Sequence, residues 1–166
     1  MPLSLVAEGT SITPTTVTAA RVEVLQAETE EEIRQAVAVS APVWGYSPEQ
    51  QEQLVLERVG YLGIRNRRGG YLLAMVGGQA AGTASYRYSG DGRTIYLSGA
   101  STLPYFRGRG VFHALVQWRL AQARARGCRL AAVLARQGTS APILRNLGFT
   151  RYFDMPVYQS PITPAS

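Results

Sequence analysis

Two arginines alternate with two glycines in the stretch PYFRGRGVF of residues 104–112. The run lies where an apolar, strand-like stretch ends and helical spacing begins. The first N–H groups of a helix lack intrahelical acceptors and meet the positive end of the helix dipole. Gly108 and Gly110 would let the backbone approach a ligand, and the guanidinium groups of Arg107 and Arg109 suit phosphate oxygens. The pattern therefore predicts an anion site for a phosphate or pyrophosphate group.

Two other interpretations of this run need weighing. Arginine–glycine runs also occur in disordered tails that bind RNA, and glycines can shape a turn that holds no ligand. A strand and an amphipathic helix enclose the run, which disfavours the tail. Neither alternative accounts for two arginines at the start of a helix.

The composition restricts the chemistry. All 17 basic residues are arginine, so Schiff-base catalysis and a lysine-bearing phosphate loop are excluded. Residues 92–166 hold ten arginines and one acidic residue. This excess indicates an anionic partner, which could be a nucleic acid, a phosphorylated cofactor or an acidic surface. Cys128 is the only cysteine and allows neither an intrachain disulfide nor a cysteine-built metal site, and no metal is expected.

The chain of 166 residues is long enough for one domain with a sizeable core. We expect residues 1–20, rich in Thr, Ala and Ser, to be a loosely ordered lead-in, and residues 21–166 to form a single domain. No apolar stretch reaches the length of a membrane span, and the first twenty residues do not resemble a signal peptide. A cytoplasmic protein without a membrane partner is expected.

Periodicity and turn signals predict the order of the elements. Thr29 and Glu32 form a capping box before one helix, and Pro48 begins a second helix that runs to about Tyr61. Gly77-Gly78 joins two antiparallel strands. Strands are expected at 21–25, 71–76, 79–88, 94–102, 130–134, 149–153 and 155–159, and further helices at 111–127 and 140–148. The predicted fold class is α+β: a mixed, mostly antiparallel central sheet of six to seven strands with about four helices on its faces.

The stretch PYFRGRG of residues 104–110 resembles the acetyl-coenzyme A (acetyl-CoA) signature of the GNAT superfamily of N-acetyltransferases. Its usual form is Pro-x-x-(Arg/Gln)-x-x-Gly-x-(Gly/Ala). The stretch SAPILRNLGF of residues 140–149 is similar to the family's second landmark, a short helix that closes on Gly-Phe. The resemblance covers residues 70–160 well, and residues 21–69 by the order of elements only.

The resemblance implies that acetyl-CoA is the cosubstrate and that the reaction is direct attack of a deprotonated amine on the acetyl carbonyl. In such folds the fourth and fifth strands separate, and the thioester reaches the acceptor through the gap. The strand end would pair with the pantetheine arm, and the arginine–glycine turn with the helix start would hold the pyrophosphate. These cofactor-binding residues are Ser101, Thr102, Leu103, Arg107, Gly108, Arg109, Gly110, Val111, Phe112 and His113.

Two positions depart from the family pattern. Phe112 stands where the signature has Gly or Ala, so its ring must point away from the phosphates, into the core. Leu144 stands where family members often carry a Tyr that donates a proton to the departing thiolate. Asp91 and Asp154 are the only acids after residue 90, the first in a predicted turn and the second between predicted strands. The catalytic residues therefore stay unassigned.

The acceptor site is expected in residues 40–65, a variable wall of the family's folds. Three aromatic residues would line a pocket and three glutamates would favour a cationic amine: Trp44, Tyr46, Tyr61, Glu49, Glu52 and Glu57. A solvated helix face above aromatic core residues is the alternative. The acceptor would be a small-molecule or peptide amine, and a homodimer stays open.

Two rival functions remain. A leucine at position 144, where family members often carry a proton-donating tyrosine, favours a coenzyme-binding module without turnover. In such a module, coenzyme binding would regulate a partner. The basic half of the chain favours a nucleic-acid binder. Against the nucleic acid, most arginines in residues 119–129 have the spacing of a solvated helix face, and no aromatic stacking platform accompanies them.

Overall fold

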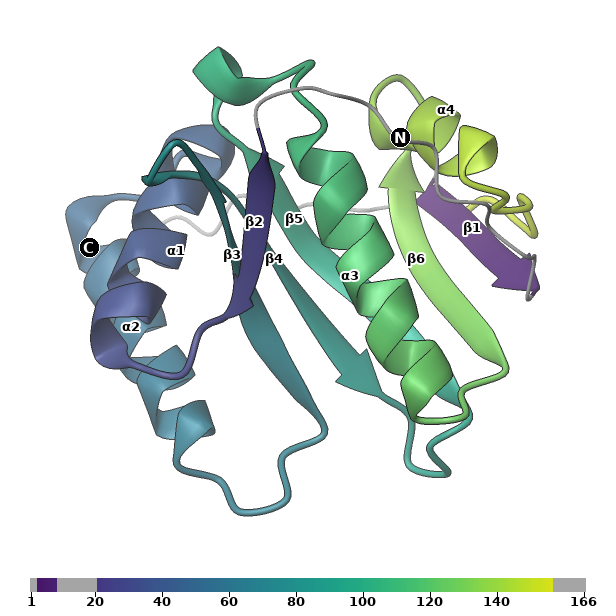
Figure 1. Cartoon of the computed structure of the whole chain (residues 1–166), viewed down its shortest axis with the longest axis horizontal. Coiled ribbons are helices and arrows are strands. Elements are labelled where there is room, and N and C mark those ends of the chain that lie inside the picture. The colour runs from purple at the N-terminus through teal and green to yellow at the C-terminus, as the bar shows by residue number, and fades with distance from the viewer. Residues whose placement is uncertain (1–2, 9–20, 157–166) are drawn as a thin grey trace, which may run out of the picture.

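The computed structural model describes residues 3–8 and 21–156. Its elements, in chain order, are β1 (Leu3–Glu8), β2 (Val22–Gln26), α1 (Glu30–Trp44), α2 (Pro48–Leu62), β3 (Gly69–Val76), β4 (Gln79–Tyr88), β5 (Thr94–Thr102), the 3₁₀ turn η1 (Pro104–Phe106), α3 (Val111–Ala125), β6 (Leu130–Arg136) and α4 (Ser140–Asn146). Figure 1 shows their arrangement. No helix among the described residues has the length and hydropathy of a transmembrane span.

The described strands form one mixed sheet in the order β1-β6-β5-β4-β3-β2 (Figure 1). β5 and β6 are parallel, and the other neighbours are antiparallel. Five strands lie between residues 22 and 136, and β1 adds one more at the outer edge of β6. The α+β class and the four α-helices are confirmed for the described part of the chain.

The ends of the sheet differ from the prediction. Thr150 makes only an isolated bridge and residues 151–156 have no regular structure, whereas residues 157–159 lie outside the described range. The predicted closing strands are therefore wrong where they can be observed, and the described residues from 21 onward supply five strands, whereas six to seven were predicted. The physical reason is that β1 already pairs along the edge of β6 where a closing strand would pair. Leu3–Glu8, predicted to be loosely ordered, supplies that strand.

Side-chain caps fix the starts of α1 and α2, and both helices begin where the sequence predicts. Thr29 Oγ1 accepts from the Glu32 N–H, and the Glu32 carboxylate accepts from the Thr29 N–H. Ser47 and Gln50 form the equivalent pair before α2, with Pro48 in its first position. These bonds satisfy N–H groups that have no intrahelical partner.

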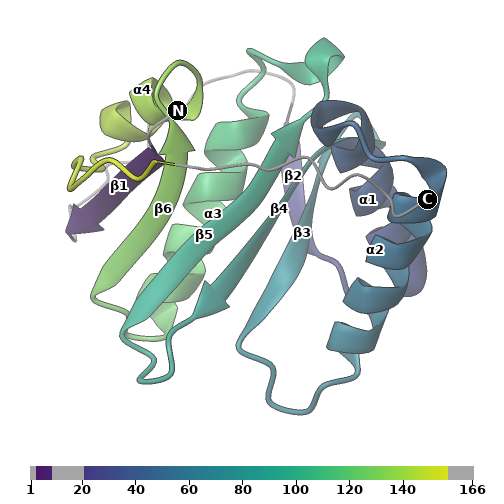
Figure 2. The ribbon, with the colours of Figure 1, turned by 180° about the vertical axis from the view of Figure 1, so that it is seen from behind.

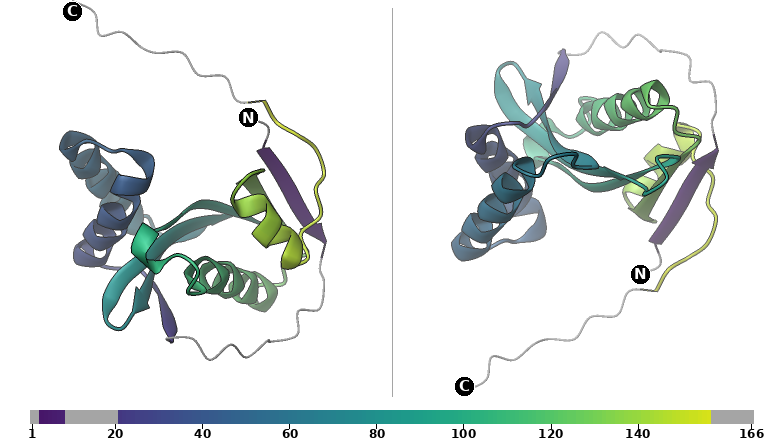
Figure 3. Two further views of the ribbon diagram at one scale, coloured as in Figure 1. Left: turned by 90° about the horizontal axis from the view of Figure 1, so that it is seen from above. Right: turned by 90° about the horizontal axis from the view of Figure 1, so that it is seen from below.

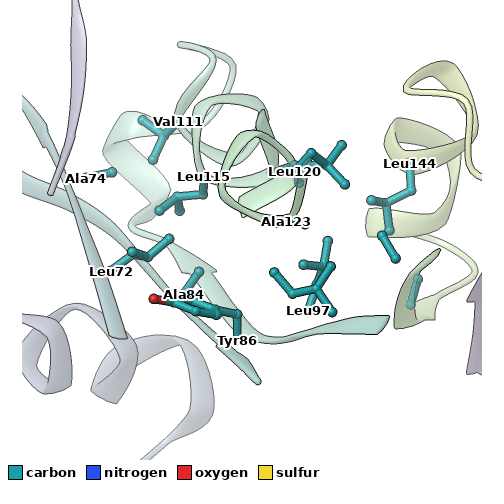
Figure 4. Close-up of a cluster of buried hydrophobic side chains, with 14 of the residues drawn as sticks. Leu72, Ala74, Ala84, Tyr86, Leu97, Val111, Leu115, Leu120, Ala123 and Leu144 are labelled. Carbon is teal, nitrogen blue, oxygen red and sulfur yellow. The ribbon is translucent and has the colours of Figure 1, made fainter. Parts of the chain in front are cut away.

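Helices cover both faces of the sheet (Figures 1, 2 and 3). α1 packs on β3, β4 and β5 and also on α2, whereas α3 packs on β2 to β5 from the other side. The main core lies between α3 and the sheet and extends to α4; Figure 4 shows Leu97, Leu115 and Leu144 within it. A Cβ on Gly82 of β4 would be only 2.4 Å from Val111 Cγ1. The missing side chain thus lets the first turn of α3 rest directly on the sheet.

Candidate functional site

The parallel strands β5 and β6 separate part of the way along the sheet. Their pairing runs from Thr94 with Leu130 to Leu97 with Val133 and then stops. β5 nevertheless continues to Thr102. Figures 1 and 2 show the two strands diverging toward the end where η1 and α4 lie. The backbone of residues 99–102 therefore has no partner strand on its β6 side.

β5 carries a bulge where it leaves β6. Ser98 pairs with Ser85, and Ser101 pairs with Thr83, so two residues of β5 oppose one residue of β4. Gly99 lies in this bulge with φ of +57°, and a Cβ there would be 2.9 Å from Ser85 Oγ. Bulges bend a strand and re-aim its backbone groups, and they are frequent next to active sites.

A cleft of about 600 Å³ opens between the separated strands. β5 lines it from Leu97 to Thr102, and the turn before α3 and the inner side of α3 line it from one side. The end of β6 and the start of α4 line it from another side. Val43 and Trp44, at the end of α1, also line it. Because α1 and α3 cover opposite faces, the cleft passes through the sheet.

Two glycines shape the turn at the start of α3. Gly108 and Gly110 have φ of +73° and +79°, a region that disfavours residues with a Cβ. Gly110 is the N-cap, and no side chain caps this helix. The first intrahelical bond runs from the Ala114 N–H to the Gly110 carbonyl. The N–H groups of residues 111–113 therefore lack intrahelical acceptors at the cleft wall, an arrangement suited to an anion.

Most of the predicted cofactor-binding residues line this cleft: Ser101, Thr102, Arg107, Gly108, Gly110, Val111, Phe112 and His113. Leu103 and Arg109 are not among the lining residues. Leu103 donates its N–H to the Ala81 carbonyl at 3.0 Å and packs against the core. The Arg109 guanidinium carbon lies 4.7 Å from the centre of the Tyr105 ring. The side chain of Arg109 thus stacks on η1 instead of entering the cleft.

The hydroxyls at the end of β5 differ in their partners. Ser101 Oγ accepts from Trp44 Nε1 at 2.7 Å. Thr102 Oγ1 is buried and has no hydrogen-bond partner. A buried hydroxyl without a partner costs free energy, so Thr102 offers a donor or acceptor to a ligand in the cleft.

Arg119 of α3 is a cleft residue that the sequence predicts as part of a solvated helix face. Arg124, Arg126 and Arg129 are exposed, as predicted for most arginines of residues 119–129, but Arg119 is the exception at only 2% exposed. Its Nε donates to the Leu115 carbonyl at 2.9 Å, and Nη1 donates to the carbonyls of Ser85 at 3.1 Å and Ser98 at 3.4 Å. Burial lowers the pKa of Arg119 to about 10, so the group stays charged at neutral pH. Its four-residue spacing from Leu115 places it on the apolar stripe, which is the signal that could have identified it.

The two departures from the family pattern have clear structural positions. Phe112 is half-buried and packs against the main core, as expected. Leu144 is fully buried and lines the cleft. An apolar side chain therefore fills the position at which family members often carry a tyrosine.

The predicted acceptor wall contributes one residue to the cleft. Of the six proposed, only Trp44 is among the residues lining the cleft. Glu52 pairs with Arg34, Glu49 accepts from Ser47, and Glu57 accepts from Gln53. Tyr61 packs edge-on against Tyr71, and Tyr46 is half-buried outside the lining. The glutamates therefore lie on the solvated surface, as in the alternative interpretation.

Neither late aspartate belongs to the cleft lining. Asp91 accepts from Ser89 and from the Arg93 N–H within the turn before β5, and both bonds lower its pKa. Asp154 pairs with Arg151. The described residues contain no cluster of three or more His, Cys, Asp or Glu side chains that could hold a metal ion.

Comparisons with known proteins agree with this geometry. Residues 29–149 match the model of the Acetyltransferase (GNAT) family. The structure of AAC(6')-Iy with a bisubstrate analog is 20% identical and has a TM-score of 0.67; the match covers 86% of this chain and 99% of that one. A transcriptional regulator from Bacillus halodurans C-125 is 22% identical with a TM-score of 0.70, over 84% and 100% of the two chains.

A predicted acetyltransferase from Clostridium acetobutylicum with acetyl-CoA is 17% identical, with a TM-score of 0.64 over 84% of this chain and 96% of that chain. A search of curated proteins found no match. At these identities the solved structures show a shared fold. The family model, in contrast, matches most of the sequence, and the chain belongs to the GNAT family of acetyltransferases.

Proposed function

We propose that the chain is an acetyl-CoA-dependent N-acetyltransferase that transfers the acetyl group directly to an amine. Acetyl-CoA is the cosubstrate of the family. The observation that carries the proposal is the cleft through the sheet. It has the uncapped start of α3 at one end and opens beside α1 at the other.

The residues of the cleft fit this cosubstrate. The free N–H groups of residues 111–113 and the guanidinium of Arg107 suit a pyrophosphate. The backbone of residues 99–102, which has no partner strand on the β6 side, offers donors and acceptors to the amides of a pantetheine arm. Thr102 Oγ1 supplies one more polar group that has no partner within the protein.

The thioester supplies an activated acetyl group with a fairly good leaving group. Two protons matter for the reaction: the one that the amine must lose before it attacks, and the one that the departing thiolate can gain. No carboxylate of the described residues lines the cleft to take a proton from the amine, so we propose that the amine arrives neutral. Leu144 cannot donate a proton to the departing thiolate. Positive charge near an amine lowers its pKa. The cleft contains three arginines, Arg107, Arg119 and Arg136, which favour a neutral amine and a departing thiolate.

Two of the similar structures are aminoglycoside acetyltransferases, one of them from an uncultured soil metagenomic sample in complex with sisomicin. They support an amine as the acceptor of this chain. We expect the enzyme to work in the cytoplasm, a reducing compartment in which the free thiol of Cys128 stays reduced.

Calorimetric titration with acetyl-CoA and desulfo-CoA, followed by a thiol-release assay over a panel of amines, tests the proposal. Binding of both coenzymes and thiol release with at least one amine are expected. No binding at high micromolar concentrations would overturn coenzyme use altogether. Leu144 favours a second candidate, a coenzyme-binding regulatory module, which predicts tight binding without thiol release for any amine.

A further inference from the structure

The described residues give the cleft positive charge and no carboxylate side chain. Three arginines and His113 line it, but no aspartate or glutamate does. The sequence holds 11 acidic residues, and only Glu8 lies in a segment whose side chains the structure does not describe. The backbone of Glu8 pairs with Leu130, at the opposite end of β6 from Arg136. Among the residues that the structure describes, the charged side chains that line the cleft are therefore all basic.

Arg136, the last residue of β6, lies at the α1 end of the cleft. Its guanidinium carbon lies 5.0 Å from the centre of the Trp44 ring. Trp44 is the last residue of α1, and its hydrogen bond to Ser101 Oγ fixes the indole against β5. The Arg136 guanidinium thus stacks on the Trp44 ring at the opening between β6 and α1.

This opening lies on the face of the sheet opposite to the start of α3. Gly82 faces Val111 of α3, and its pairing partner Thr102 shares that face. The next pair, Thr83 with Ser101, faces the other side, where Trp44 contacts Ser101. Under the proposed function, the coenzyme phosphates occupy the α3 end. The Arg136 end is then where the acceptor enters.

Arg136 has no ion-pair partner among the side chains that the structure describes. The ion pairs among the described residues involve Arg21, Arg34, Arg67 and Arg151, and none involves Arg136. Arg136 is exposed and keeps its stack on Trp44. A guanidinium held on a ring presents its N–H donors in a fork that matches a carboxylate or a phosphate.

We infer that Arg136 binds an oxyanion on the acceptor, so that the substrate is an amine that also bears a carboxylate or phosphate group. Trp44 covers the carbon chain between the amine and the oxyanion. The inference rests on the proposed function, because it assigns the acceptor of that same cleft. A polycationic amine such as an aminoglycoside would place several ammonium groups beside arginines without any carboxylate to balance them, and it is disfavoured.

Matched pairs of amines test this inference. The carboxylate arm uses ω-amino acids from glycine to ε-aminocaproate, each against its primary amide. The phosphate arm uses aminoalkyl phosphates against the corresponding amino alcohols, and sisomicin serves as the polycation. Calorimetry on the protein–CoA complex measures binding, and thiol release from acetyl-CoA measures transfer. The arm with the tighter binder identifies the oxyanion.

The best anionic member should bind at least about tenfold more tightly than its neutral counterpart. Arg136→Gln should remove this difference and raise KM rather than lower kcat. Arg136→Lys should keep part of it, because the charge stays and the fork is lost. Arg145→Gln is the matched control: it changes the net charge by the same amount as Arg136→Gln, but on the exposed surface of α4 outside the cleft. This variant should keep the full difference in affinity between the anionic amine and its neutral counterpart. Thermal unfolding verifies that each variant is folded.

Equal binding of charged and neutral partners, or preference for sisomicin, would overturn the inference. So would a difference that survives in Arg136→Gln. If anionic amines bind through Arg136 but none is acetylated, the inference holds and the proposed transfer fails. If neutral amines are acetylated with kcat/KM unchanged in Arg136→Gln, the transfer holds and the inference fails.

Discussion

Gly110 and Gly127 lie at the two ends of α3 in nearly the same backbone conformation. Their φ angles are +79° and +77°, and a Cβ built on either meets no atom within 4 Å. Of the two, only Gly110 lines the cleft. Alanine at each position therefore imposes the same local strain. The two variants differ in what the new methyl group would meet when the coenzyme binds.

The strain and the binding loss can be estimated separately. A residue with a Cβ in the left-handed region costs about 1–2 kcal/mol. For a chain of this size, each kcal/mol shifts Tm by roughly 2–4 °C. Both variants should show this loss. In addition, Gly110→Ala disturbs the N–H groups of residues 111–113, and losing one hydrogen bond to a charged group costs about 1.5–3 kcal/mol. That corresponds to a rise of roughly 10- to 150-fold in the Kd for acetyl-CoA.

The assay compares the wild type with three variants. Calorimetric titration with acetyl-CoA gives Kd, and thermal unfolding without ligand gives Tm. Gly110→Ala should raise the Kd for acetyl-CoA by roughly 10- to 150-fold. Gly127→Ala should lower Tm to a similar extent but leave Kd within about twofold of the wild-type value. His113→Ala should also leave Kd nearly unchanged, because its contribution is a backbone N–H that alanine keeps.

Equal values of Kd for the two glycine variants, at equal loss of Tm, would refute the role of the turn in holding the pyrophosphate. A loss of affinity in His113→Ala as large as that in Gly110→Ala would assign the binding to the imidazole instead of the backbone.

Three further predictions concern the support of the cleft. Gly82→Ala should lower the free energy of unfolding in urea by about 1–3 kcal/mol, because its Cβ would be 2.4 Å from Val111 Cγ1; unchanged stability would contradict the close packing of α3. Thr102→Val removes a buried hydroxyl that has no partner, so coenzyme affinity should fall while Tm stays equal or rises; a clear drop in Tm would show that the hydroxyl supports the fold. Burial raises the pKa of Tyr86 from 10.0 to about 12, so the folded state keeps a proton that the unfolded chain releases in this range. The free energy of unfolding should therefore fall as pH rises from about 10 to about 12, and less steeply in Tyr86→Phe; an identical slope would exclude Tyr86 as the cause.

The sequence predicts well those features whose cause is local. The capping box at Thr29 and the turn at Gly110 depend on a few neighbouring residues and on the φ angles that glycine permits. The start of α3 is also predictable, because it depends on the glycines directly before it. The closing strands depend on a distant competitor, since Leu3–Glu8 occupies the edge of β6, and no periodicity after Phe149 shows that the edge is taken.

Residues brought together across the fold were the least predictable. Trp44 and Arg136 meet because α1 ends above the point where β5 and β6 separate, and neither residue has a sequence pattern that indicates the other. The glutamates of α2 have the same types and spacing whether they face a cleft or solvent. Arg119 is the exception among the arginines of residues 119–129, because its position on the apolar stripe of α3 outweighs the usual exposure of a charged side chain.

Leu144 and the arginines of the cleft bear on the same charge balance. Under the proposed function, transfer begins with a neutral amine and ends with a thiolate, and positive surroundings favour both species. Arg119 is held without a carboxylate, with Nη1 3.4 Å from the carbonyl of Ser98, the residue before Gly99 in the bulge. In a buried position this charge is screened less than it would be in water. The field of the cleft therefore supplies part of what a tyrosine would supply by donating a proton, and a leucine at position 144 is compatible with turnover.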